Sequence, residues 1–110
     1  MNIQEDYVSD EIFKLLKKKG FDDSCCRFVI ESDETYYRGA PTLQMAMKWL
    51  REVHNINIDI VSIWNHKRFE YQVFIITPKN AKYCYIDDKL YLVYEEACEA
   101  AIKYCLENLI

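Results

Sequence analysis

The stretch APTLQMAMKWLREVHNINIDIV, residues 40–61, decides the fold, because the spacing of its apolar residues changes within it. Its first part repeats apolar residues at helical spacing, which predicts an amphipathic helix over residues 41–55. Its second part alternates apolar with polar residues, which predicts a strand over residues 56–64. The helix is predicted to bury Leu43, Ala46, Met47, Leu50 and Val53.

More alternating runs follow this strand. Residues 69–76 are predicted to pair with it as an antiparallel hairpin, since only a short polar connection separates the two runs. A third strand is predicted over residues 81–87, and the stretch LYLVY at residues 90–94 could add a fourth short strand. Consecutive strands with short turns indicate an antiparallel meander of three to four strands.

Helices are also predicted near both ends of the chain. Residues 6–19 carry an apolar stripe, with Gly20 as a left-handed stop. Residues 94–109 carry another, although Val93 is a poor cap for that helix. The acidic stretch at residues 22–39 is predicted to be mainly a loop, with room for a short edge strand.

Together these elements predict one α+β domain over residues 1–110, in the order α-α-β-β-β-α. We expect a two-layer sandwich in which two to three helices pack on one face of the sheet. The other, tyrosine-rich face would then be partly solvated or would form a contact surface.

Composition narrows the possible functions. The net charge of −4 disfavours nucleic acid as a partner, because binding to phosphates favours basic proteins. The polar start of the chain predicts no signal peptide, and no apolar run reaches the length of a membrane span. With five cysteines and no export signal, we expect reduced thiols and a cytoplasmic location.

Three blocks of the sequence resemble one family. They are FKLLKKKGFDDSC at residues 13–25, APTLQMAMKWLREVHNI at residues 40–56 and YEEACEAAIKYCLENLI at residues 94–110. These blocks resemble a family of small uncharacterised proteins encoded by phages and mobile elements of gut anaerobic bacteria. This chain departs from the family pattern at Val93, where a Ser or Thr cap is expected. The resemblance implies an accessory role that could act on a host component.

The residues that carry chemistry are scattered, so we predict no catalytic, cofactor or metal site. Cys25 and Cys26 are adjacent, and two neighbouring thiols seldom bind the same ion. Cys98 and Cys105 are two helical turns apart on the predicted inward face, where thiols behave as small apolar groups. The only glycines are isolated, which excludes a glycine-rich phosphate loop.

The leading hypothesis is therefore a non-enzymatic module that binds another protein or a second copy of itself. Its candidate contact residues are aromatic: Trp49, Trp64, Tyr71, Tyr83 and Tyr85. The alternative is a nucleic-acid-binding accessory factor that uses a basic hairpin tip. Its candidate contacts are His66, Lys67 and Arg68.

Overall fold

The protein has an α+β fold, which confirms the predicted class. The computed structural model describes residues 6–22, 29–30, 37–38, 41–65, 67–76, 81–86 and 89–110, with backbone alone at 29–30, 37–38 and 81–86. The elements are α1 (Asp10–Lys18), β1 (Val29–Ile30), β2 (Tyr37–Arg38), α2 (Leu43–His54), β3 (Ile56–Ile63), β4 (Arg68–Ile76), β5 (Ala81–Ile86) and α3 (Tyr94–Asn108). The predicted order is not confirmed, because the antiparallel pair β1–β2 lies between α1 and α2.

α1 begins later than predicted because Ser9 caps it. The Ser9 hydroxyl accepts a hydrogen bond from the Ile12 N–H at 3.3 Å, and such a cap fixes where a helix starts. Before Ser9, Tyr7 forms an isolated antiparallel bridge with Thr42, and the Val8 N–H donates to the Pro41 carbonyl at 3.0 Å. At the other end, Gly20 has a φ of 95°, as expected for a left-handed stop.

α2 matches its prediction except for one residue of the buried face. Thr42 caps its start by accepting from the Met45 N–H at 3.1 Å, and Asn55 ends it in the left-handed conformation. Val53 was predicted to be buried, but 58% of it is exposed. Each residue of a helix is rotated by about 100° from the one before it, so Val53 lies about 60° around the helix axis from Leu50, at the margin of the buried stripe. His54 falls near the centre of that stripe instead.

The main sheet contains β3, β4 and β5 in that order, all antiparallel. β3 pairs with β4 in an unbroken register from Ile56 opposite Ile75 to Ile63 opposite Arg68. The stretch at residues 90–94 makes one isolated antiparallel bridge, between Phe69 and Tyr91, rather than a fourth strand. The chain then turns at once into α3.

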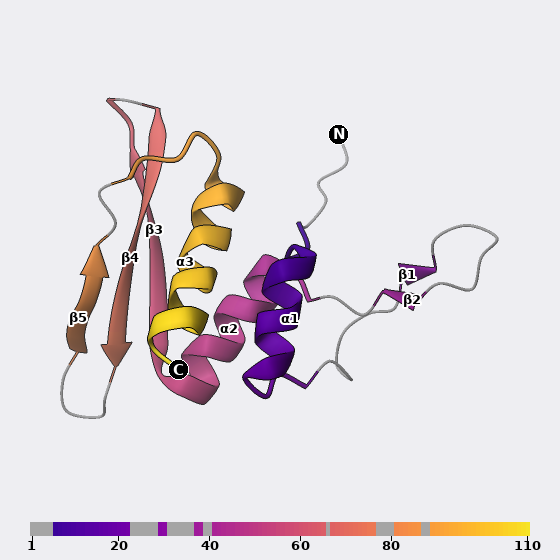
Figure 1. The fold of residues 1–110 in the computed structure, drawn as a ribbon. Helices are drawn as coiled ribbons and strands as arrows, with labels where there is room; N and C mark the ends of the chain where they lie inside the picture. Colours follow the sequence, from indigo (N-terminus) through magenta and orange to yellow (C-terminus); the bar gives the residue numbers. More distant parts are fainter. Residues whose placement is uncertain are drawn as a thin grey trace.

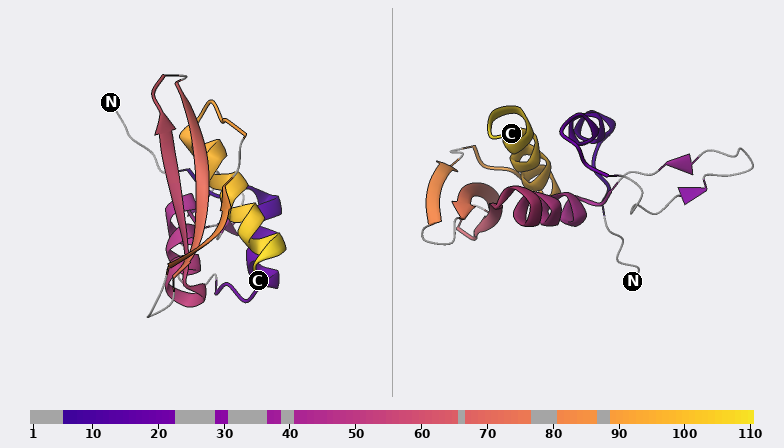
Figure 2. Two further views of the ribbon diagram at one scale, coloured as in Figure 1. Left: turned by 90° about the vertical axis from the view of Figure 1, so that its left-hand side faces the viewer. Right: turned by 90° about the horizontal axis from the view of Figure 1, so that it is seen from below.

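The helices lie at two distances from the sheet (Figures 1 and 2). α3 packs against β3 and β4, α2 packs against β3 and α3, and α1 packs on α3, farther from the sheet. The core contains residues from all three helices and from β3 and β4. Those with no exposed surface include Leu16, Leu50, Val73, Ala101, Ile102 and Leu106. Among the described residues, no helix has the length and apolar content needed to cross a membrane.

Candidate functional site

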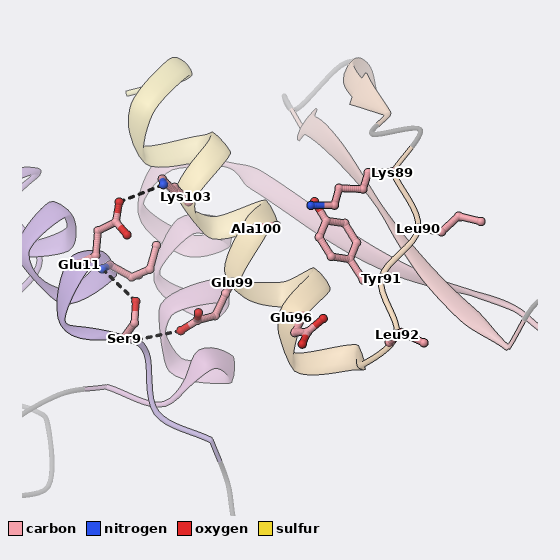
Figure 3. A pocket seen from close by; sticks show the side chains of 11 residues that line it. Ser9, Glu11, Lys89, Leu90, Tyr91, Leu92, Glu96, Glu99, Ala100 and Lys103 are labelled. Carbon is pink, nitrogen blue, oxygen red and sulfur yellow. Dashed lines mark hydrogen bonds and ion pairs between the residues drawn. The ribbon is translucent and has the colours of Figure 1, made fainter.

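A groove of about 540 Å³ runs over the outward face of α3 (Figure 3). Its floor comes from α3, one wall from the start of α1, and the other wall from the connection between β5 and α3. The residues that line it are Ser9, Glu11, Ile12, Lys89, Leu90, Tyr91, Leu92, Glu96, Glu99, Ala100 and Lys103. A volume in this range suits a ligand or the anchoring side chains of a partner.

Two polar contacts fix the wall that α1 provides. The Ser9 backbone N–H donates to Glu99 Oε1 at 2.8 Å, and Lys103 Nζ lies 2.9 Å from Glu11 Oε1. The hydrogen bond with Glu11 raises the pKa of Lys103 above its usual value. These contacts hold two of the groove's carboxylates in place within the fold.

The opposite wall is the connection that carries Tyr91. The Tyr91 ring lies 6.2 Å from the Tyr71 ring, and Lys89 Nζ lies 5.2 Å from the centre of the Tyr91 ring. The neighbouring apolar residues remain accessible, since Leu90 is 41% exposed and Leu92 is 63% exposed. Figure 3 shows both leucines on the outer side of this connection, away from α1.

A smaller hollow of about 230 Å³ adjoins the groove at the start of α3. It is lined by Asp6, Tyr7, Leu43, Glu95, Glu96 and Glu99. Four of these six residues are carboxylates, which makes this side of the molecule locally acidic. Within the described part of the chain, no group of three or more His, Cys, Asp or Glu residues is arranged to hold a metal ion.

The turn between β3 and β4 holds the predicted basic tip. Trp64 is 82% exposed there, and Lys67 adopts a φ of 51°. The Arg68 guanidinium donates to the Lys67 carbonyl at 3.2 Å. His66 lies outside the described residues. The turn therefore combines an exposed indole with the cationic side chain of Lys67.

The other predicted aromatic contacts lie in different environments. Tyr71 is only 4% exposed and belongs to the core, so it cannot form part of an open contact surface. Trp49 is half-buried, with its ring 5.5 Å from Phe21 and 4.7 Å from His54. Tyr83 and Tyr85 lie on β5, where they pair with Phe74 and Val73 of β4. Only the backbone of these two tyrosines is among the described parts of the chain.

Both described thiols are buried. Neither Cys98 nor Cys105 forms a disulfide, and both have no exposed surface. Burial raises the pKa of the Cys98 thiol to about 11, which disfavours the nucleophilic thiolate. Its hydrogen-bond partner is Tyr94 rather than an imidazole. Cys25, Cys26 and the side chain of Cys84 lie outside the described part.

We assign no function to the imidazole of His54. Its Nε2 atom is buried and has no hydrogen-bond partner among the residues that the structure describes. The ring packs edge-on against Trp49. This arrangement places the imidazole as a packing group in the last turn of α2.

Sequence reasoning missed the exposed apolar residues around Tyr91. The alternation in LYLVY was interpreted as a strand, but the same alternation also separates the inward Tyr91 from the exposed Leu90 and Leu92. The contact of Ser9 with Glu99 joins residues 90 positions apart, and no local pattern signals it. Chemically, the groove offers carboxylates, ammonium groups and apolar walls, which suit binding.

Comparison with protein-family models, curated proteins and solved structures found no match for this chain.

Proposed function

We propose that this protein is a non-enzymatic interaction module that binds another protein through one apolar end of the fold. We define this apolar end as Trp64, Leu90, Leu92 and Val93. The single observation that carries the proposal is the exposure of Trp64, at 82% of its surface. Tryptophan is, with tyrosine and arginine, one of the residue types enriched among those that dominate binding energy at protein interfaces.

The four residues belong to the same end of the sheet. The bridge between Phe69 and Tyr91 is antiparallel, so the residues after Tyr91 run back toward the turn that holds Trp64. Figure 1 places that turn and the connection to α3 at the same end of the molecule. Leu92 and Val93 are 63% and 43% exposed. A partner that covers this end would bury several apolar side chains together.

The composition of the neighbouring groove supports binding rather than catalysis. None of its lining residues is a histidine or a cysteine, and its carboxylates Glu11 and Glu99 already have partners within the fold. The resemblance to small phage and mobile-element proteins implies an accessory role. The partner class that we propose is therefore a protein of the host cell.

The test compares what two variants retain from a host lysate, by quantitative mass spectrometry. Trp64→Ser with Leu92→Ser should reduce capture of a specific protein at least about 30-fold, since a hot-spot residue contributes roughly 2 kcal/mol or more. Val53→Ser is the matched control, because Val53 is 58% exposed but lies on α2. It should leave capture unchanged.

Two results would contradict the proposal. One is equal loss of a captured protein in the control and in the double variant, which would indicate nonspecific apolar adsorption. The other is a set of retained proteins that neither variant alters. Circular dichroism should first establish that both variants are folded.

A second candidate function is contact with nucleic acid through the same turn. It is favoured by the exposed Trp64 beside Lys67, since an aromatic ring can stack on bases while cations contact phosphates. Single-stranded DNA and RNA oligonucleotides should then bind at low salt and dissociate steeply as salt increases. Lys67→Glu with Arg68→Glu should abolish binding. An absence of binding at low salt would exclude this function.

A further inference from the structure

All three helices that the structure describes begin at the same end of the fold, toward the top of Figure 1. Tyr7, which precedes α1, forms a bridge with Thr42, the residue that caps α2. The Gln44 amide in the first turn of α2 donates to the hydroxyl of Tyr94, the first residue of α3, at 3.3 Å. The dipoles of the three helices therefore point in the same direction.

α1 and α3 are in contact in this parallel orientation. The Ser9 N–H at the start of α1 donates to Glu99, which lies near the start of α3 and 90 positions along the chain. Lys19 Nζ at the end of α1 donates to the Ile110 carbonyl at the end of α3, 91 positions along the chain, at 2.8 Å. Parallel neighbours place the like ends of two dipoles side by side, and the sheet offsets them little, since its own dipole is small. A further helix antiparallel to both would be favoured by their dipoles.

The groove over α3 leaves an open surface along this helix pair. A second hollow of about 490 Å³ adjoins the groove and shares Glu11 and Lys103 with its lining. The other residues that line the second hollow are Lys14, Leu15, Lys18 and Glu107. The two hollows together therefore extend from the start of α1 to its last turn.

The charge along this surface changes sign. At the start of α3 the small hollow is lined by four carboxylates, and none of the described residues that line it is a cation. These carboxylates belong to Asp6, Glu95, Glu96 and Glu99. In the second hollow lysines outnumber glutamates three to two, and Lys14 and Lys18 are exposed there. A partner segment that is basic at one end and acidic at the other would match both ends.

We propose that this surface binds an amphipathic helix of a partner protein, antiparallel to α1 and α3. The C-terminal half of that helix carries lysine or arginine beside the four carboxylates. Its N-terminal half carries aspartate or glutamate beside Lys14 and Lys18. Its apolar face covers the half-buried Leu15, Tyr91 and Ala100. The same order of charges also stabilises the docked helix itself, because acidic residues favour a helix start and basic residues a helix end.

This surface is separate from the turn that carries Trp64. Leu90 and Leu92 line the groove and also lie at or beside the apolar end, so the tests below alter neither. They alter Glu96 and Lys14, which lie on α3 and α1 and are both exposed. Loss of binding here and loss of binding at Trp64 can therefore be distinguished.

The test is selection from a displayed library of amphipathic helices of about 15 residues, the length of α3. Each library helix has a constant leucine stripe and either lysine or glutamate at every other position. Selection on the full chain should enrich helices with glutamate in the N-terminal half and lysine in the C-terminal half. Several exposed ion pairs acting together should favour that order roughly tenfold over its reverse.

A charge exchange in the protein separates this preference from the intrinsic preference of the library helices. Glu96→Lys with Lys14→Glu keeps the net charge but inverts the order along the surface, so the preference should fall at least about threefold. Glu52→Lys with Lys48→Glu is the matched control, because both residues are exposed on α2. It should leave the preference unchanged. If the first variant fails to fold, Glu96→Gln with Lys14→Gln should weaken the preference in the same direction.

Four results would overturn the proposal. Selection on the wild type could enrich no helix, or it could enrich the reversed order of charges. The preference could be equal in the wild type and in the folded Glu96 and Lys14 variant. A photoreactive group at the C-terminal end of the best helix should label the protein near Glu96, so labelling near Lys18 would contradict the orientation. Finally, a dimer that Glu96→Lys dissociates, measured by light scattering, would assign the surface to a second copy instead.

Discussion

Tyr71 and Trp64 are both aromatic, but the fold places them in opposite environments. Tyr71 is 4% exposed, with Tyr91 and Tyr104 rings within 6.4 Å, whereas Trp64 is 82% exposed at a turn. Both were candidates for a contact surface on the basis of residue type. Residue type alone cannot separate them, because burial depends on which face of the sheet a helix covers.

This contrast predicts a large difference in stability between two truncations. Tyr71→Ala should lower the free energy of unfolding by about 3–5 kcal/mol, as expected for removal of a buried aromatic ring. Trp64→Ala should change it by no more than about 0.5 kcal/mol. Urea denaturation measures both values. Similar losses in the two variants would contradict the assignment of Tyr71 to the core and Trp64 to the surface.

A second prediction at this scale concerns the pH dependence of stability. Burial raises the pKa of Cys98 from 9.0 to about 11, so the fold favours the neutral thiol. The associated stabilisation is complete below pH 9 and is lost as the pH rises through about 11. Between pH 9 and about pH 11, the free energy of unfolding should fall more steeply for the wild type than for Cys98→Ala. Parallel curves of the two proteins from urea denaturation would contradict this expectation.

At the scale of elements, the three main helices differ in how they begin. Ser9 and Thr42 each accept a backbone hydrogen bond at the start of α1 and α2. Val93 holds the same position before α3 with extended dihedral angles, but it forms no such bond. The unpaired N–H groups at the start of α3 are partly compensated by Glu95 and Glu96 in its first turn.

The missing cap predicts a stabilising substitution. Val93→Thr keeps the branched side chain and adds a hydroxyl that can accept an N–H of the first turn. It should raise the free energy of unfolding by about 1 kcal/mol. Thermal unfolding checks this value, with Val93→Ala as the control that shortens the side chain without adding an acceptor. A Thr variant no more stable than the Ala variant would show that the position does not act as a cap.

The elements could be predicted from sequence where their spacing is local. The change of period near Asn55 located α2 and β3, because the alternation of burial follows directly from helix and strand geometry. The start of α1 was misplaced because Val8, just before Ser9, hydrogen bonds to Pro41, far along the chain. Val53 was misassigned because it lies at the margin of its stripe.

At the scale of the whole molecule, α1 is attached mainly through one face. Ile12 and Leu16 are buried against the core, and Ser9 and Glu11 contact Glu99 and Lys103 of α3. This packing creates the wall of the groove. It could not be predicted from sequence, since the contacts join the first helix to the last and carry no local signal.

Attachment mainly through one face predicts that α1 can open separately from the sheet. Leu16→Ala should cost about 2–5 kcal/mol, because Leu16 has no exposed surface. In hydrogen exchange, α1 amides should lose protection before amides of β4 do. Lys14→Ala is the surface control within α1, since Lys14 is exposed. Equal loss of protection in α1 and β4 would indicate one cooperative unit instead.

The docking of α1 on α3 also has a consequence for synthesis on the ribosome. Translation proceeds at roughly 5–20 residues per second, so α3 emerges on the order of 4–15 s after α1. During that interval the apolar stripe of α1 has no partner helix to cover it. The nascent chain must therefore carry an uncovered hydrophobic segment until α3 has been synthesised, and chaperones that bind nascent chains would find it accessible during that interval.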